Sequence, residues 1–232
     1  MVGSTFPFGF DQKFHPNGAK LFNARIIPIR GSWIDFTTDI NDILFTIIDR
    51  KRKFPATLLL RSLGFSSDED IYNAFDLVLD IDPSKIKTDN LTDYITVEDT
   101  IDMETGELVV ESGKELNETI VSTLKNNKTK TVKLVDVRNN IDSMMIYNTI
   151  KKDPTKSTEE ALLKVYYLLR GSDAPSPESA QKFIDRMFFS PKKYDLGQVG
   201  RYRLDKQFDL DNKGNDSVLT HDDFLITIKY LI

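Results

Sequence analysis

The sequence predicts an α+β fold, a domain of mixed strands and helices interrupted by a small β-rich inserted subdomain. Short strand-like runs separated by turn residues fill the first third of the chain, and capped amphipathic helical patterns fill the last third. The polar middle carries a small pattern of its own. Strands followed by helices, instead of regular alternation, are typical of α+β architectures. We therefore expect a main domain from 9–82 and 139–232, with 83–138 as the insertion.

The first strands follow a Pro-Asn-Gly turn. Residues 1–8 show no periodicity and are expected to be disordered or derived from cloning. Beyond the turn, strand-like runs are predicted at 21–30, 32–38 and 43–49. Side chains alternate between the two faces of a strand, so the second run places Ile34 and Phe36 on one face and the chain's single tryptophan, Trp33, on the other with Asp35 and Thr37. This pattern favours an exposed tryptophan, although a sandwiched sheet would bury both faces.

The helices are predicted mainly from their caps. Pro55 at a first helical position and Gly64 at an end define a short helix, and Ser67 caps the next. Residues 95–137 are predicted to form strand, turn at 104–106, strand, helix from Asn117, and strand. Three further helices begin at capping residues, which are Ser157 with Glu160, Ser176 with Pro177, and Thr220 with Asp223. The last pattern continues to Ile232, which favours a piece of a longer protein.

Composition excludes several classes of protein. The 232 residues are 40% hydrophobic and 29% charged, as in ordinary globular proteins. The absence of cysteine excludes disulfides and thiolate metal sites and fits a cytoplasmic location, and two histidines nearly exclude a histidine metal centre. No apolar run approaches the length of a membrane span. Residues 209–220 resemble an EF-hand loop, but Lys213 and Thr220 stand where oxygen ligands are needed, so we expect a polar loop without calcium.

Charge is unevenly distributed along the chain. Residues 13–61 hold nine Lys or Arg against four Asp, a net charge of +5, whereas 62–119 hold three Lys against sixteen acidic residues, a net charge of −13. Two surfaces with different partners would explain this division, and so would two solvated faces of one soluble protein.

The basic half contains the sharpest candidate site. Four adjacent cations, Arg50 to Lys53, repel one another unless an anion lies near, and phosphate is the usual counterpart. The flat ring of Trp33 suits stacking on an unpaired base. A solvated basic loop beside a half-buried tryptophan remains the alternative. No glycine-rich phosphate loop, serine nucleophile elbow or His-Glu metal helix occurs, so an enzyme complete in this chain is disfavoured.

Five ordered segments resemble the lobe region of the bacterial RNA polymerase beta subunit. They are "NARIIPIRGSWIDF", "IDRKRKFPATLLLRSLGF", "DPTKSTEEALLKVYYLLRG", "FFSPKKYDLGQVGRYRLDK" and "LTHDDFLITIKYLI". The similarity covers nearly all of 9–80 and 141–232. Residues 95–137 resemble the lineage-variable insertion of this domain, with a weaker match.

The resemblance implies one wall of the polymerase DNA cleft, facing downstream duplex and the non-template strand. It implies that Trp33 stacks on a non-template base, that the Asp-Arg-basic run lies near that strand, and that Arg170 faces the cleft. No catalytic or metal-binding residue is expected, because Mg²⁺ is held by another subunit of the enzyme. Expected partners are DNA, the other polymerase subunits and sigma factor, with no membrane, and the isolated fragment is expected to be monomeric. The candidate DNA-binding residues are Arg30, Trp33, Asp49, Arg50, Lys51, Arg52 and Arg170.

Two other hypotheses stay open at this point. A free-standing protein-interaction module could share the fold without the polymerase. A small hydrolase could use the abundant carboxylates, although the sequence displays no acidic cleft.

Overall fold

The computed structural model describes residues 8–14, 18, 20–86, 88–101, 106, 108–126, 131–210 and 217–232. The chain forms two compact units, Met1–Ser66 with Asn148–Ile232, and Ser67–Tyr147, called here unit 1 and unit 2. Helices and antiparallel sheets occur together, which confirms the predicted α+β class. The predicted insertion, 83–138, lies inside unit 2, and its boundaries stay a prediction. Of residues 1–8, predicted to be disordered or cloning-derived, 1–7 lie outside the described residues and Phe8 begins a strand.

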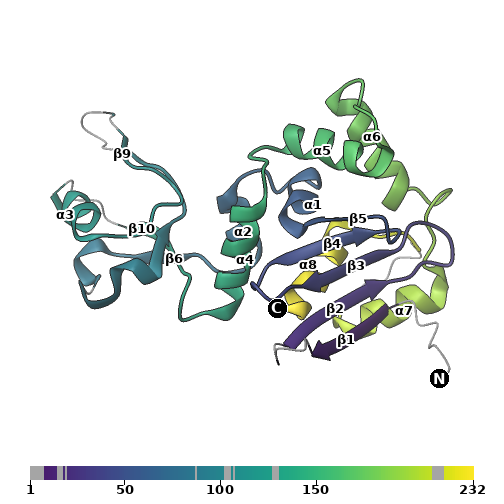
Figure 1. The fold of residues 1–232 in the computed structure, drawn as a ribbon, viewed down its shortest axis with the longest axis horizontal. Helices are drawn as coiled ribbons and strands as arrows, with labels where there is room; N and C mark the ends of the chain where they lie inside the picture. The colour runs from purple at the N-terminus through teal and green to yellow at the C-terminus, as the bar shows by residue number, and fades with distance from the viewer. Residues whose placement is uncertain are drawn as a thin grey trace. The chain divides into compact units, whose positions relative to one another are not determined.

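Unit 1 contains a five-stranded antiparallel sheet with its strands in sequence order (Figure 1). The first predicted run, 21–30, ends earlier than expected, at Ile26, since Pro28 has no N–H to donate to a ladder. The next strand begins at Ile34 instead of 32, so Trp33 precedes the strand that was predicted to contain it. The strands are β1 (Phe8–Phe14), β2 (Lys20–Ile26), β3 (Ile34–Thr38), β4 (Leu44–Ile48) and β5 (Arg52–Pro55).

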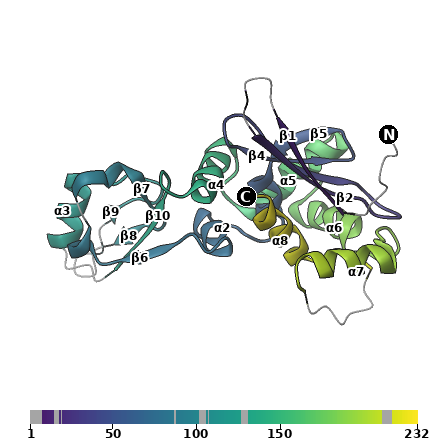
Figure 2. The same ribbon diagram turned by 90° about the horizontal axis from the view of Figure 1, so that it is seen from below.

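One face of this sheet is the core of unit 1. Ala24, Ile34 and Phe36 on this face are fully buried, as the predicted alternation requires for the last two. Helices α7 (Gly197–Gln207) and α8 (His221–Leu231) lie on one side of the sheet, α7 against β1 and α8 against β2 (Figure 2). The opposite face is only partly covered. Asp35 is buried there because Arg25 on the neighbouring strand pairs with its carboxylate.

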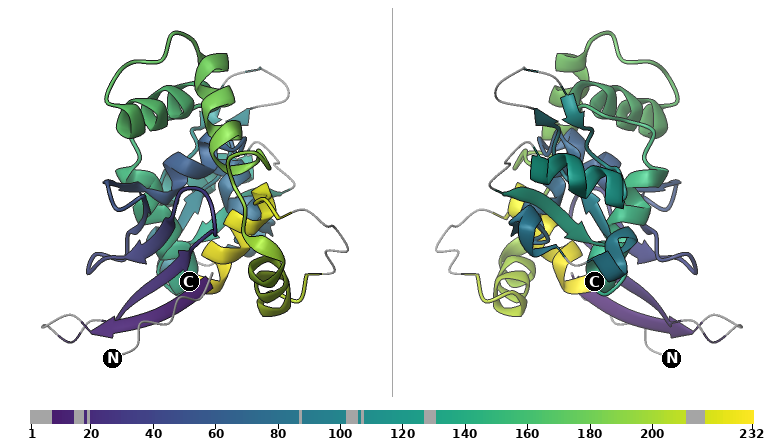
Figure 3. Two further views of the ribbon diagram at one scale, coloured as in Figure 1. Left: turned by 90° about the vertical axis from the view of Figure 1, so that its right-hand side faces the viewer. Right: turned by 90° about the vertical axis from the view of Figure 1, so that its left-hand side faces the viewer.

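The remaining helices of unit 1 begin largely where the capping residues predict. Helix α1 (Ala56–Ser62) follows Pro55, which is its N-cap and not its first residue. Helices α5 (Thr158–Arg170) and α6 (Pro177–Phe188) pack against each other (Figure 3) and are capped by Ser157 and Ser176. In the predicted capping box, the Glu160 carboxylate would accept the N–H of Ser157. It accepts the N–H of Lys156 instead, one residue earlier. The reciprocal box of Thr220 and Asp223 on α8 is confirmed. Helix α4 (Ile141–Lys152) spans the division between the units.

Helix α7 was not predicted, because two glycines and few apolar residues give it no amphipathic stripe. Its place is fixed by a buried ion-pair network instead. Arg201 on α7 donates to both carboxylate oxygens of Asp223 at 2.7 and 2.8 Å, and it also pairs with Asp205. Although burial lowers the pKa of Arg201, these carboxylates raise it overall, so the guanidinium stays charged. The network ties α7 to the N-terminus of α8.

Unit 2 has its own sheet and core. Strands before and after a helix occur as predicted, but the described residues from 94 on hold three short strands before the helix and not two. Leu116, Leu124 and Leu134 are fully buried in the core of this unit. Part of the predicted turn, 104–105, lies outside the described residues. Lys133 binds Glu69 and Glu98 at 2.7 and 2.9 Å. The elements are α2 (Asp68–Ala74), β6 (Leu79–Ile81), η1 (Pro83–Lys85), η2 (Thr88–Asp93), β7 (Tyr94–Thr96), β8 (Thr100–Ile101), β9 (Leu108–Val110), α3 (Glu118–Asn126) and β10 (Val132–Asp136), with sheet orders β6-β10-β7 and β8-β9.

Candidate nucleic-acid interface

The loop before Trp33 is fixed by a distant segment of unit 1. The backbone N–H groups of Ile29 and Arg30 donate to the carbonyl of Asp195 at 2.8 and 3.2 Å, and the Asp195 N–H donates to the Arg30 carbonyl at 2.7 Å. Gly31 has a φ of +129°, and a Cβ there would lie 2.6 Å from Cδ2 of Tyr194. Only glycine fits this position without strain. The loop therefore leads into Trp33 along a defined path.

Trp33 is half-buried and makes two backbone hydrogen bonds to one residue. Its N–H donates to the Asp49 carboxylate at 2.8 Å, and its carbonyl accepts the Asp49 N–H at 2.9 Å. The Arg50 guanidinium lies over the indole, with Cζ 4.5 Å from the ring centroid. The structure thus brings together Trp33, Asp49 and Arg50, three of the residues predicted as a site. They come from the loop before β3 and the turn after β4.

Asp49 and Arg50 form an unusual turn. Both have positive φ values, 50° and 57°, and the Lys51 N–H closes the turn on the Ile48 carbonyl at 3.0 Å. Two successive left-handed residues are the pattern of a type I′ turn, which normally selects Asn-Gly. Neither residue here is glycine, so the turn is strained. The contacts of this turn with Trp33 compensate for that strain.

The other predicted cations are exposed and lie in different surroundings. Arg30 donates to the Pro191 carbonyl at 2.9 Å and lies 3.8 Å from the Asp195 carboxylate, yet its side chain is 58% exposed. Lys51 is in the turn, whereas Arg52 opens β5. Arg52 and Lys53 thus belong to a strand, where successive side chains point to opposite faces. Lys53 lies over the ring of Phe45, 4.0 Å from its centroid.

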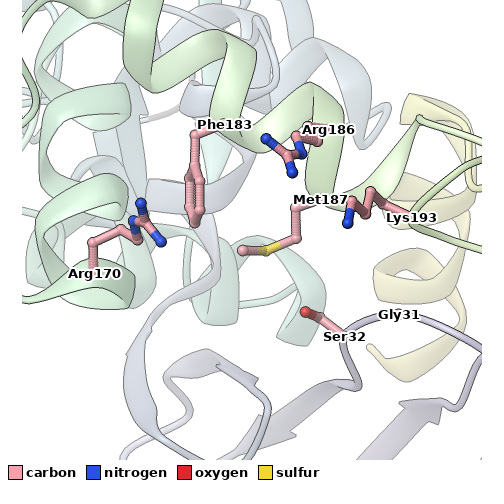
Figure 4. A pocket seen from close by; sticks show the side chains of 7 residues that line it. All are labelled: Gly31, Ser32, Arg170, Phe183, Arg186, Met187 and Lys193. Carbon is pink, nitrogen blue, oxygen red and sulfur yellow. The ribbon is translucent and has the colours of Figure 1, made fainter.

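A pocket of about 410 Å³ lies beside the loop that precedes Trp33 (Figure 4). Arg170, the remaining predicted residue, lines it, and its Cζ is 5.4 Å from the ring centroid of Phe183. Sequence reasoning missed the other two cations, Arg186 on α6 and Lys193 in the following loop, whose charged ends point into the same space. In the sequence, the only indication of these two cations was the group of basic residues around "FFSPKK". The lining residues are Gly31, Ser32, Arg170, Phe183, Arg186, Met187 and Lys193, among which no carboxylate occurs.

Two titrating groups behind the loop hold fixed charge states. The N–H of Gly197, followed by Ser217 and the nearby charge of Arg30, lowers the pKa of Asp195. Burial, followed by the charges of Asp223 and Asp49, raises the pKa of Tyr194, whose hydroxyl has no hydrogen-bond partner among the described residues. Tyr194 is therefore neutral at physiological pH and acts as a packing surface for the loop.

The arrangement offers an aromatic ring, exposed cations and a cationic pocket, which together suit a polyanion with stackable bases. Within the described ranges, no group of three or more His, Asp or Glu is placed to hold a metal ion. Half of the EF-hand-like loop, 211–216, lies outside those ranges. No helix in the described part of the chain combines the length and the apolar composition needed to cross a bilayer.

Comparison with known proteins identifies the family of this chain. The family model described as RNA polymerase Rpb2, domain 2, matches residues 10–115 and 120–232. The chain belongs to this family. This chain is 41% identical over 243 residues to the DNA-directed RNA polymerase subunit beta of Flavobacterium psychrophilum, and 42% identical over 241 residues to that of Porphyromonas gingivalis. Both alignments cover 96% of this chain and 19% of the relative, so the chain spans about a fifth of their length. The resemblance predicted from the five motifs is confirmed.

Proposed function

We propose that this chain is the lobe of a DNA-directed RNA polymerase beta subunit and forms one wall of the DNA cleft. In this proposal it contacts the non-template strand and the downstream duplex during transcription. The observation that carries it is the placement of the Trp33 ring, with Arg50 over it, directly after the loop that lines the cationic pocket.

The site matches the chemistry of a single strand. Ser32 lines the pocket and Trp33 follows it in the chain, so a group for phosphate and a group for a base are adjacent. Arg170, Arg186 and Lys193 supply positive charge where the lining has no carboxylate. Aromatic rings stack on any base, and cations bind the backbone through direct contact and counterion release. This combination supports binding without sequence preference.

The rest of the proposal follows from the relatives, which are named as polymerase beta subunits. Phosphodiester synthesis and its Mg²⁺ then belong to other parts of the enzyme, and this chain contributes positioning of DNA. The other polymerase subunits and sigma factor are its proposed partners, the cytoplasm is its proposed location, and the isolated chain is proposed to be a monomer.

The test is binding of a single-stranded thymidine oligonucleotide to the 232-residue chain across a range of salt. Replacing Arg170, Arg186 and Lys193 with Gln should weaken binding and flatten the salt dependence, by about 0.7 in slope for each phosphate that is no longer neutralised. The matched control replaces three exposed lysines on other elements, Lys125, Lys151 and Lys152, with Gln. Equal slopes for the two triple variants would contradict the proposed site.

A further inference from the structure

We infer that Asp49 is a positioning residue for Trp33, and that the Asp49–Arg50 turn leaves one face of the indole open for a single base. The base is part of the proposed function, on which this half of the inference rests. The positioning of the ring is independent of DNA. Asp49 then acts through Trp33 and makes no contact of its own with the strand.

The first argument is the pair of reciprocal hydrogen bonds. The Asp49 side chain binds the Trp33 N–H at 2.8 Å, while its backbone N–H binds the Trp33 carbonyl at 2.9 Å. Since Trp33 lies just before β3 and outside its ladder, these bonds satisfy backbone groups that a strand partner would otherwise satisfy. They fix the backbone from which the indole projects. The Asp49 carboxylate is also a poor ligand for a phosphate group, because both groups are negatively charged.

The second argument is the conformation of the turn. Non-glycine residues rarely adopt positive φ, and here two adjacent ones do, at 50° and 57°. Strain of this kind persists where surrounding contacts over-determine it, and it gathers at functional positions. The left-handed conformation of Asp49 directs both its carboxylate and its N–H toward Trp33. The same conformation at Arg50 accompanies the placement of its guanidinium over the ring.

The third argument concerns the faces of the indole. Arg50 lies over the ring with Cζ 4.5 Å from the centroid, within the range of a cation–π contact. A guanidinium in that position occupies one π face. We assign the opposite face to the stacked base, which would place the ring between Arg50 and one nucleobase. Arg50 thereby adds positive charge next to the strand while it holds the ring in place.

The positioning is tested without DNA, by the fluorescence of Trp33, the chain's single tryptophan. Asp49→Ala removes the carboxylate acceptor, so we expect a shift in the emission maximum and a larger acrylamide quenching constant. Asp49→Asn keeps an acceptor oxygen and tolerates positive φ, so its emission and quenching should match wild type. The matched control is Asp42→Ala, since Asp42 also has a positive φ, 53°, in the turn at the opposite end of β4. Unchanged quenching in Asp49→Ala would overturn the inference.

The same proteins are then titrated with the thymidine oligonucleotide at low salt. If Asp49 acts through Trp33, Asp49→Ala binds about fivefold or more weakly, the lower end of one base stack, and Asn restores the affinity. If Asp49 only contributes negative charge near the strand, both variants bind more tightly than wild type, which would refute the positioning role. Failure of the wild-type chain to bind at all would count against the proposed function. The quenching result would still decide whether Asp49 positions the ring.

Discussion

The loop leading to Trp33 should tolerate no side chain at Gly31. With a φ of +129°, any other residue there carries a backbone cost of about 1–3 kcal/mol. In addition, the new Cβ would lie 2.6 Å from the Tyr194 ring, which is fully buried and has no room to retreat. Overpacking of this kind costs roughly 1–3 kcal/mol more. Gly31→Ala should therefore destabilise the chain by about 2–6 kcal/mol.

Gly64 is the matched control, because its φ is +109° and nothing lies within 4 Å of a Cβ built there. Gly64→Ala should show only the backbone cost, so Gly31→Ala should melt about 2–12 °C lower, at roughly 2–4 °C for each kcal/mol. Thermal denaturation followed by circular dichroism measures the difference. In a Tyr194→Leu background the extra cost of Gly31→Ala should largely disappear. Equal melting temperatures for the two alanine variants would refute the close approach of Tyr194 to the loop.

Three further outcomes are expected. Arg201→Met should destabilise the chain by about 3–5 kcal/mol in urea unfolding, because Asp223 would be left buried and unpaired, whereas Arg30→Met should cost less than about 1 kcal/mol; similar losses would contradict the buried network. The lowered pKa of Asp195 means that its stabilisation is present above pH 3.8 and is lost as the pH falls through the lowered value. The difference in Tm between wild type and Asp195→Asn should therefore shrink on acidification, and a constant difference would show that the carboxylate is not involved. Replacing 83–138 with a Gly-Ser linker should leave a cooperative thermal transition, since all of these residues belong to unit 2; loss of cooperativity would assign the insertion to the main core.

Local signals in the sequence predicted the elements well. Ser67, Ser176 and Thr220 cap helices as expected, because a cap depends on residues three positions apart. Helix α7 escaped prediction because its stability comes from Arg201 and a carboxylate 22 residues away, which no local pattern contains.

The candidate site could be predicted only in part, because its contacts also join residues that are distant in the sequence. Trp33 and Arg50 were identified by residue type, and the structure brings them together. The hydrogen bonds of Asp49 to Trp33 cross 16 residues, so the sequence indicated a charged neighbour and not a positioning contact. Arg186 and Lys193 join Arg170 only through the fold of α5 and α6. The boundaries of β2 and β3 were wrong where backbone groups of 29–33 bond to distant segments instead of the sheet.

The central claim is that Trp33 and the cations beside it hold the non-template strand. The most direct measurement is the lifetime of the open complex, over a range of salt, in a reconstituted polymerase whose beta subunit carries this sequence. Trp33→Ala should lose a stacking contribution of about 1–3 kcal/mol, nearly independent of salt. Neutralising Arg170, Arg186 and Lys193 should shorten the lifetime most at low salt and flatten its salt dependence. Wild-type lifetimes for Trp33→Ala, together with an unchanged salt slope for the triple variant, would contradict the account.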